Sequence, residues 1–505
     1  MSKIYFPDGT TVNFAPETTV EKVQNSSVAL WNELKPTDAI MGDFLTGDFF
    51  ALAYMAAAIL FILGLKGLAS PATARRGNLF AMLGMILAIG VTFLHPSVTS
   101  YTFILAGMAV GAVIGIPIAL KINMTSMPQL VAILHSFVGL AAVLVAGGMY
   151  LATPEAHDTV SLVEIFMGAW IGAITFTGSV IAFGKLQGIF RSAPVVFKGQ
   201  HLVNLAIFVA MIWFGAQFVM HQDFTSFMIM CALAFVLGIT LIIPIGGADM
   251  PVIVSMLNSY SGWAAAATGF TLNNMVLIIA GAIIGSSGAI LSYIMCRAMN
   301  RSFISVVLGG FGAEADESDA KQGAAQQGVK EAAIEDAAYM MENGSSVIIV
   351  PGYGMAVAQA QHALKEAAEL LEEKGIDVKF AIHPVAGRMP GHMNVLLAEA
   401  DVSYDNVVEM DDINSSFSQT DVVLVVGAND VVNPDAKDDS SSPLYGMPIL
   451  EAYKSNMVYV VKRSMRAGYS GVENSLFFKD NTYLVFGDAK DIAEGLVSTL
   501  KGGGH

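Results

Sequence analysis

Two glycines separated by one residue follow a short apolar run in the C-terminal half of the chain. They begin the hexapeptide Gly352-Tyr353-Gly354-Met355-Ala356-Val357. The run before it, Val347-Ile348-Ile349-Val350, predicts a buried strand because β-branched residues dominate it. Glycines in a strand-to-helix turn let the backbone approach a pyrophosphate, which the N-terminus of the following helix also favours. The hexapeptide therefore predicts dinucleotide binding, although Val357 replaces the usual last glycine; a purely structural turn is the alternative.

The segment after the next expected strand indicates which dinucleotide would bind. An NAD site usually has an acid there, which holds the ribose 2′-hydroxyl. Here the strand expected at 378–382 runs into His383-Pro384-Val385-Ala386-Gly387-Arg388, which contains no acid and so favours the 2′-phosphate of NADP(H). Two basic places can neutralise this phosphate: Arg388, which the conventional binding direction favours, and Lys462-Arg463-Ser464.

Strands and helices alternate through this whole region, which predicts a Rossmann-like doubly wound parallel sheet. Ligands of such sheets bind at the carboxyl ends of strands, near the point where strand order reverses. The expected strands are 347–350, 378–382, 407–410, 422–426, 458–461 and 483–486, and the expected helices are 356–374, 392–400, 413–419, 449–455 and 489–500. Polar residues that follow the later strands are further site candidates, with ordinary turn chemistry as the alternative: Asn429, Asp430, Asn433 and Tyr469.

The first 300 residues are more apolar than the rest of the chain. Hydrophobic residues make up 54% of the 505-residue chain and charged residues 13%, and the apolar excess lies in this part. A membrane-spanning helix needs about 20 mostly apolar residues. Nine segments qualify: 49–65, 79–94, 103–120, 130–150, 162–183, 202–219, 224–245, 251–270 and 275–296. The eighth is the weakest, because it contains Asn258 and three neighbouring polar residues.

Loop charges predict how these spans are oriented. Lys and Arg remain on the cytoplasmic side of a membrane. They follow the first, third, fifth and ninth spans, whereas the short loops after the second, fourth, sixth and eighth contain none. This alternation predicts an N-terminus outside, a cytoplasmic C-terminal domain and an odd number of spans, which supports the eighth.

Four polar residues at or inside the spans are candidates for function. His135 lies about two turns into the fourth span, where an ionisable group is costly and usually faces the bundle interior. Two roles fit His135: it takes part in a proton relay, or it is a neutral histidine that forms a hydrogen bond between helices. Asn258 can line a channel or hold helices together. Asp249, in the loop after the seventh span, and Glu164, at the outer end of the fifth, suit ordinary solvated positions.

The remaining segments complete the domain organisation. We expect a polar N-terminal extension at 1–46, a membrane domain at 47–302, a polar linker at 303–345 with a short surface helix at 331–341, and the nucleotide domain at 346–505. The net charge of −16 argues against nucleic acid as a partner. Cys231 and Cys296 lie in apolar segments, so their spacing predicts neither a disulfide framework nor a metal site.

Several long motifs in the C-terminal half resemble those of one family. They are Val350-Pro351-Gly352-Tyr353-Gly354-Met355-Ala356-Val357, His383-Pro384-Val385-Ala386-Gly387-Arg388, Gly391-His392-Met393-Asn394-Val395-Leu396-Leu397-Ala398-Glu399-Ala400, Gly427-Ala428-Asn429-Asp430, Lys462-Arg463-Ser464-Met465 and Phe486-Gly487-Asp488-Ala489-Lys490. With the spans before them, they resemble the beta subunit of proton-translocating NAD(P) transhydrogenases over about residues 41–500.

The resemblance implies a role for each candidate residue. NADP(H) would lie reversed relative to ordinary Rossmann enzymes, with its 2′-phosphate at Lys462, Arg463 and Ser464 and its pyrophosphate near Arg388. The phosphate turn would include Gly352, Gly354, Ala356 and Val357, and Asp430 would be an acid near the nicotinamide that is implicated in coupling. Further residues would also bind the cofactor: Tyr353, Met355, Gly427 and Asn429. Tyr469 would belong to a loop closing over the nucleotide. His135 and Asn258 would belong to the proton path, and Asp249 would be a loop acid facing the nucleotide domain.

The resemblance also implies partners and a location. NAD(H) would bind an alpha subunit, and hydride transfer between NADH and NADP⁺ would be coupled to inward proton movement. Two alpha–beta units would associate in the bacterial inner membrane. The cofactors would supply the redox chemistry, so no side chain is expected to act as a catalytic acid or base. From the residues alone, a channel or transporter gated by a nucleotide and a membrane-anchored NADP reductase are the alternatives.

Overall fold

The computed structural model describes residues 3–5, 11–13, 47–68, 71–96, 98, 100–152, 157–190, 194–309, 328–389, 391–442, 444–465 and 472–502. The chain forms two compact units, residues 1–101 and 102–505. The first unit contains a short antiparallel pair, β1 (Lys3–Tyr5) and β2 (Thr11–Asn13), and the helices α3 (Gly47–Leu68) and α4 (Pro71–Leu94). The two helices pack so closely that a Cβ built on Gly67 would lie 2.5 Å from the Cα of Gly77.

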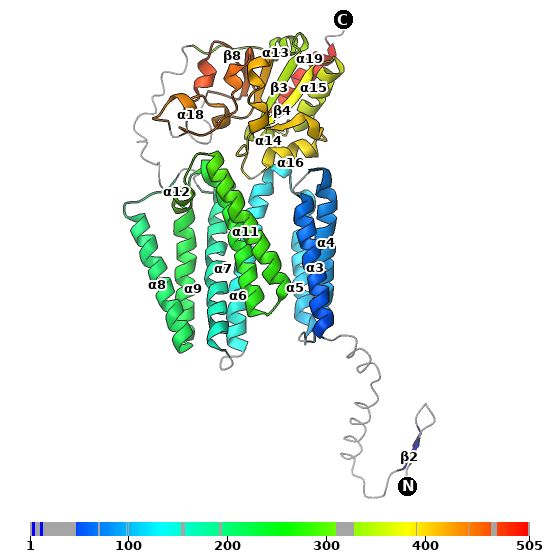
Figure 1. Ribbon diagram of the computed structural model, residues 1–505, viewed down its shortest axis with the longest axis vertical. Helices are drawn as coiled ribbons and strands as arrows, with labels where there is room; N and C mark the ends of the chain where they lie inside the picture. Colours follow the sequence, from blue (N-terminus) through cyan, green and yellow to red (C-terminus); the bar gives the residue numbers. More distant parts are fainter. Residues whose placement is uncertain are drawn as a thin grey trace. The chain divides into compact units, whose positions relative to one another are not determined.

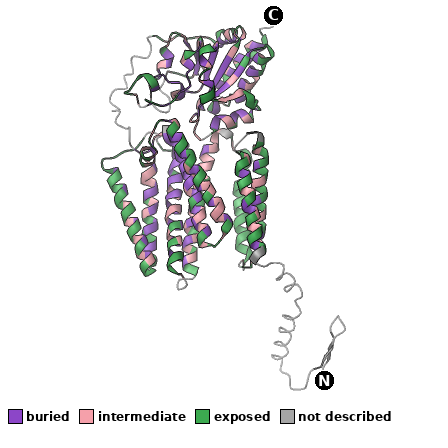
Figure 2. Cartoon of the chain, in the orientation of Figure 1, coloured by how far each residue is buried: buried purple, intermediate pink, exposed green. Residues whose placement is uncertain are grey.

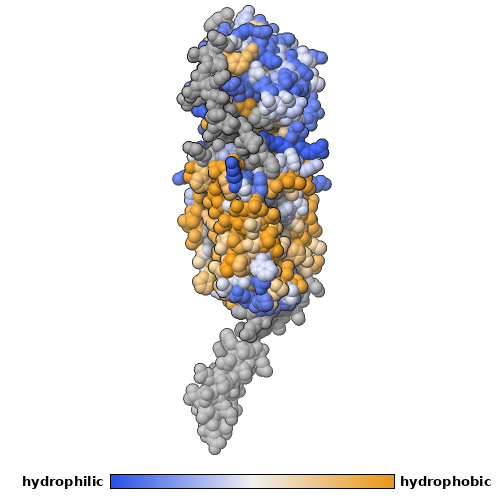
Figure 3. All heavy atoms as spheres, turned by 90° about the vertical axis from the view of Figure 1, so that its left-hand side faces the viewer, coloured by the Kyte–Doolittle hydropathy of each residue, from blue (hydrophilic) through white to orange (hydrophobic). Residues whose placement is uncertain are grey.

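The second unit begins with seven long helices (Figure 1). They are α5 (Tyr101–Lys121), α6 (Met127–Ala152), α7 (Thr159–Leu186), α8 (Gln200–His221), α9 (Phe224–Ile242), α10 (Met250–Thr271) and α11 (Met275–Ala298). In the described part of the chain, eight helices are long and apolar enough to cross a membrane, and they match eight of the nine expected spans. Apolar side chains form a continuous belt on the face shown in Figure 3.

Helix α10 is the eighth expected span. It forms a 22-residue helix at the expected place but is not among the eight apolar ones. It packs against α6, α7 and α11, so its polar residues meet protein instead of lipid. The Ser259 hydroxyl donates to the Gly285 carbonyl at 2.6 Å, and a Cβ on Gly281 would lie 2.4 Å from the backbone nitrogen of Ala266. Gly281 and Gly285 have the G-x-x-x-G spacing that allows close helix packing, and α10 and α11 pack closely at these glycines.

Lys185 follows the fifth expected span, 162–183, in the sequence, but in the structure it lies inside α7. Its side chain is buried, and its ammonium donates to the carbonyls of Ile243 and Ile245 at 2.5 and 2.7 Å. These carbonyls follow the last residue of α9, where helix carbonyls lack intrahelical donors. The lysine thus ties the end of α9 to α7.

The C-terminal domain is built on a six-stranded parallel sheet with the order β5-β4-β3-β6-β7-β8. The strands are β3 (Ser346–Pro351), β4 (Asp377–Ile382), β5 (Val407–Glu409), β6 (Val422–Val426), β7 (Met457–Lys462) and β8 (Thr482–Phe486). All six expected strands are confirmed, as is the doubly wound class. Strand order reverses between the neighbours β3 and β6, where Val350 pairs with Val425.

Helices cover both faces of this sheet, and its strands are buried from both sides (Figure 2). One face carries α13 (Ile334–Glu342), α15 (Gln361–Glu373), α16 (His392–Glu399) and α19 (Ala489–Gly502). The other carries shorter pieces: α17 (Met410–Ile413), η5 (Phe417–Gln419), η7 (Ala452–Lys454) and η8 (Ser475–Phe478). The helices expected at 413–419 and 449–455 are therefore only single turns.

Two further expectations need correction. The helix expected at 356–374 is two helices, α14 (Tyr353–Ala358) and α15, because Gln359 takes a left-handed conformation with φ 54°. The helix expected on the surface near 331–341 exists as α13, but it packs into the core against α19. Its buried residues are Ile334, Ala337, Ala338 and Met341, a spacing of one apolar helix face.

We predict that Met341→Ala destabilises the C-terminal domain by about 2–5 kcal/mol, because it leaves a cavity beneath α13. Tyr339→Ala, on the exposed side of the same helix, should change stability by less than about 0.5 kcal/mol. The measurement is limited proteolysis of the full chain in detergent along a urea gradient. Equal protease sensitivity of the two variants would show that α13 is a surface helix after all.

Candidate functional site

A cavity of about 690 Å³ lies at the carboxyl ends of the strands. Its walls include the turns that follow β3, β4, β6, β7 and β8. Of the candidate nucleotide-binding residues, Gly352, Tyr353, Gly354, Val357, Arg388, Gly427, Asn429, Asp430, Lys462, Arg463 and Ser464 line it. Met355 and Ala356 do not, because both are fully buried beneath the turn. Tyr469 lies outside the described residues.

The glycine turn and the turn after β6 touch through their backbones. Gly352 N–H donates to the Val426 carbonyl at 2.9 Å, and Gly354 N–H donates to the Gly427 carbonyl at 3.0 Å. A Cβ on Gly352 would lie 2.4 Å from the Ala428 nitrogen, and Gly427 has φ +70°, so side chains are excluded from both positions. The contact leaves an open stretch of backbone at the strand-reversal point, where ligands of this fold bind.

The segment after β4 forms one side of the cavity. The Arg388 guanidinium lies over the Tyr353 ring, 4.0 Å from its centroid, and Nη1 donates to the Leu186 carbonyl at 3.1 Å. The Arg388 backbone N–H donates to Nδ1 of His392 at 3.1 Å. Burial, reinforced by the Arg388 charge, lowers the pKa of His392 to about 4, so the ring is neutral. From the sequence, His392 was noted only as part of the motif at 391–400. Its bond to the Arg388 segment was not predicted.

The second basic place forms the opposite side. Lys462 is the last residue of β7, and its ammonium lies 4.1 Å from the centre of the Phe477 ring. Burial lowers the pKa of Lys462. Between Arg388 after β4 and Lys462 at the end of β7 lie β3 and β6. Three strand spacings correspond to about 14 Å. The cavity therefore has a cationic group on each side and the glycine turn between them.

The residues after β6 divide into two kinds. Asn429 donates through Nδ2 to Oδ1 of Asp430 at 3.0 Å, and both line the cavity. Asn433 is fully buried and donates to the Glu473 carbonyl at 2.8 Å, so it supports the loop instead. Within the described ranges, no cluster of three or more His, Cys, Asp or Glu side chains is placed to hold a metal ion.

The position of Asp249 in the loop after the seventh span predicts a solvated carboxylate, and this prediction is wrong. It is buried immediately before α10, and Nη1 of Arg301 donates to its two oxygens at 3.1 and 2.9 Å. Burial raises the pKa of Asp249, and the Arg301 charge opposes that rise. Arg301 also lines the cavity, together with Met299 and Gly247.

Ser261 links His135 to the backbone of α10 at Asn258. The Ser261 hydroxyl donates to the backbone carbonyl of Asn258 at 2.8 Å and lies 3.0 Å from Nδ1 of His135. Because its hydrogen goes to that carbonyl, the hydroxyl accepts from Nδ1–H. Nε2 is then an acceptor, and it is buried with no hydrogen-bond partner among the described residues. Neither His135 nor Asn258 lines the nucleotide cavity.

Comparison with known proteins agrees with this arrangement. The profile of the family described as "NAD(P) transhydrogenase beta subunit" matches residues 50–499. Two sequences from Rhodospirillum rubrum, both named NAD(P) transhydrogenase subunit beta, are each 56% identical to this chain over 456 residues, which is 89% of this chain and 98% of theirs. The chain belongs to the family of NAD(P) transhydrogenase beta subunits.

Proposed function

We propose that this chain binds NADP(H) in the cavity at the carboxyl ends of the strands. One observation carries the proposal: the glycine turn and the Lys462–Ser464 cluster line the same cavity, with Arg388 on its other side. Three phosphates need such a surface, since backbone N–H groups suit a pyrophosphate and a cationic cluster suits a 2′-phosphate. Arg388 already holds the Tyr353 ring and the Leu186 carbonyl, which favours Lys462, Arg463 and Ser464 for the 2′-phosphate.

We further propose that the chain exchanges hydride with NAD(H) bound to an alpha subunit. The family name already implies such a partner. Hydride transfer needs two nicotinamides close together, and the described residues form one nucleotide cavity of this type. The bound cofactors supply the redox chemistry, while Asn429 and Asp430 position the nicotinamide side. Two alpha–beta units would associate in a bacterial inner membrane, with the N-terminus of this chain outside and its C-terminal domain in the cytoplasm.

The proton enters this proposal through α10. Protonation of Nε2 would convert His135 to a cation beside Ser261 and Asn258. Asp249 precedes the first residue of the same helix, and twelve residues of helix span about 18 Å. A small movement of α10 would therefore reach the Asp249–Arg301 pair, which borders the nucleotide cavity. We propose that protonation shifts the domain between a closed state that holds NADP(H) and an open state that exchanges it.

The energetics suit this mechanism. Hydride transfer between NADH and NADP⁺ has little driving force of its own. A proton moving inward supplies about 2.3 kcal/mol per 100 mV of membrane potential. The deciding experiment reconstitutes the chain with and without its alpha partner and records proton flux together with hydride transfer from NADPH to an NAD analogue. Flux without the partner and without hydride transfer would favour a nucleotide-gated channel instead.

We predict that Lys462→Gln and Arg463→Gln each weaken NADPH binding by about tenfold to a hundredfold, because each removes a charged donor from the 2′-phosphate. NADH, which lacks that phosphate, should lose little affinity. Lys365→Gln, in an exposed pair on α15, is the control and should bind NADPH normally. Calorimetric titration of the full complex provides the measurement. Equal losses for NADPH and NADH would exclude a 2′-phosphate site here.

We predict that His135→Gln abolishes proton pumping in vesicles that contain the complex, because glutamine cannot take up the proton. NADPH formation should then no longer respond to a proton gradient. His221→Gln, at the exposed end of α8, should pump normally. A pH-sensitive dye and NADPH absorbance report the two processes. Full pumping by the His135 variant would remove this residue from the mechanism.

We predict that Arg301→Gln moves the pH profile of NADPH release to higher pH. Burial raises the pKa of Asp249 and Arg301 opposes that rise, so loss of the cation raises the pKa further. Asp249 is charged above its pKa, and the charged form will then require a higher pH. Arg297→Gln, exposed in the last turn of α11, should leave the profile unchanged. An unshifted profile in the Arg301 variant would show that the pair does not control release.

A further inference from the structure

A second large cavity lies among the membrane helices. It is an apolar slot of about 640 Å³ along one side of α7, with α8 and α9 on one flank and α10 and α11 on the other. Val163, Met167, Trp263 and Phe270 line it, and the side chains of all four are exposed. Because the slot lies within the apolar belt of these helices, it faces hydrocarbon.

The length of the slot corresponds to one leaflet of a bilayer. Along α7 it runs from Glu164 to Ile174, and ten residues of helix measure about 15 Å. The hydrocarbon core is about 30 Å thick. The length and the apolar lining of the slot suit an acyl chain of one leaflet.

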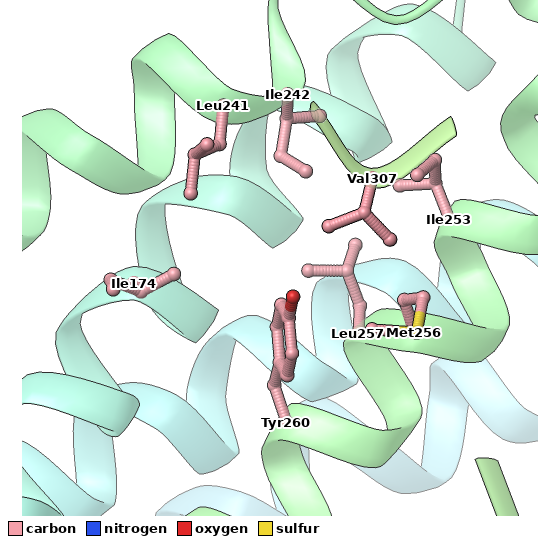
Figure 4. A pocket seen from close by; sticks show the side chains of 8 residues that line it. All are labelled: Ile174, Leu241, Ile242, Ile253, Met256, Leu257, Tyr260 and Val307. Carbon is pink, nitrogen blue, oxygen red and sulfur yellow. The ribbon is translucent and has the colours of Figure 1, made fainter. Parts of the chain in front are cut away.

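The two ends of the slot differ in polarity. Ile174, Leu241 and Tyr260 close the inner end, and they also border a smaller apolar cavity in which the Tyr260 hydroxyl is the one oxygen among the labelled side chains (Figure 4). At the other end lies the Glu164 carboxylate, which forms no hydrogen bond or ion pair with a described residue. An amphiphile with its polar group at Glu164 would match this gradient.

Charge decides which polar group fits. Segments 153–158, 222–223 and 272–274, which join the spans at the Glu164 end, contain no Lys or Arg. Asp158 and Asp223 lie there and cap α7 and α9. The carboxylates of Glu164, Asp158 and Asp223 would repel an anionic headgroup at this end. A primary ammonium would be attracted, and it can donate hydrogen bonds to the Glu164 carboxylate, which a quaternary ammonium cannot.

We propose that the slot binds a phospholipid with a primary amine headgroup, of the phosphatidylethanolamine type. The ammonium pairs with Glu164, and an acyl chain of the same leaflet fills the apolar length between α7 and α11. The bilayer supplies the lipid, so this site is independent of nucleotide binding. It adjoins α7, α10 and α11, and α10 is the helix whose Ser261 contacts His135.

The test compares lipids in nanodiscs that hold the full complex with its partner subunit. Photoactivatable phosphatidylethanolamine, phosphatidylcholine and phosphatidylglycerol are each added at trace level, and crosslinked peptides are mapped by mass spectrometry. We expect phosphatidylethanolamine to label α7 and α11 preferentially. Glu164→Gln should reduce that preference on the order of fivefold, the size of an exposed ionic contact.

Two further variants separate the slot from the general lipid surface. Ala282→Phe fills the slot and should abolish the labelling, whereas Ser287→Phe, exposed on the same helix outside the slot, should not. Three results would overturn the proposal: equal labelling by the three lipids, unchanged labelling in Ala282→Phe, or crosslinks from the slot to the partner subunit in place of lipid. Retained proton pumping in Ser287→Phe verifies that the complex is folded.

Discussion

Polar groups inside a bilayer must find partners within the protein, and α10 shows how this chain meets that constraint. Its serines donate to backbone carbonyls of the tightly packed α11, and Asp249 at its start is held by Arg301. Among the described residues, Nε2 of His135 is one of the buried side-chain atoms left without a hydrogen-bond partner. That atom can accept a proton, and α10 lies between it and the nucleotide cavity. The unpaired nitrogen of His135 and the continuous helix α10 together provide a physical route for the proposed coupling between proton binding and nucleotide binding.

In the C-terminal domain, contact between backbones determines where charge can gather. The turns containing Gly352 and Gly427 touch at the strand-reversal point and exclude side chains there. Cationic groups are consequently displaced to the sides, with Arg388 after β4 and Lys462 at the end of β7. Arg388 is occupied by Tyr353 and by the Leu186 carbonyl, so the two basic places are not equivalent. This difference supports the proposed placement of the 2′-phosphate at Lys462, Arg463 and Ser464.

Sequence patterns predicted the strands well because every strand is buried on both faces and therefore reads as a continuous apolar run. The expected spans followed from hydropathy, except α10, whose polar residues bond to α11 in a way that composition cannot reveal. The Asp249–Arg301 pair joins residues 52 positions apart, so no local sequence pattern predicted it. Likewise His392 looked like an ordinary helix residue, and its bond to Arg388 depends on the turn at Gly387, which has φ +104°. The spacing of Ile334, Ala337, Ala338 and Met341, by contrast, did contain the signal for burial of α13.

We propose that proton occupancy near His135 and nucleotide occupancy of the cavity are thermodynamically linked. Linkage is reciprocal, so NADP(H) binding must change proton binding if protonation changes NADP(H) affinity. The direct measurement adds NADPH to the purified complex in weakly buffered solution and records the protons taken up or released. The account predicts proton exchange in the wild type that is largely lost in His135→Gln. Equal proton exchange in both proteins would contradict it.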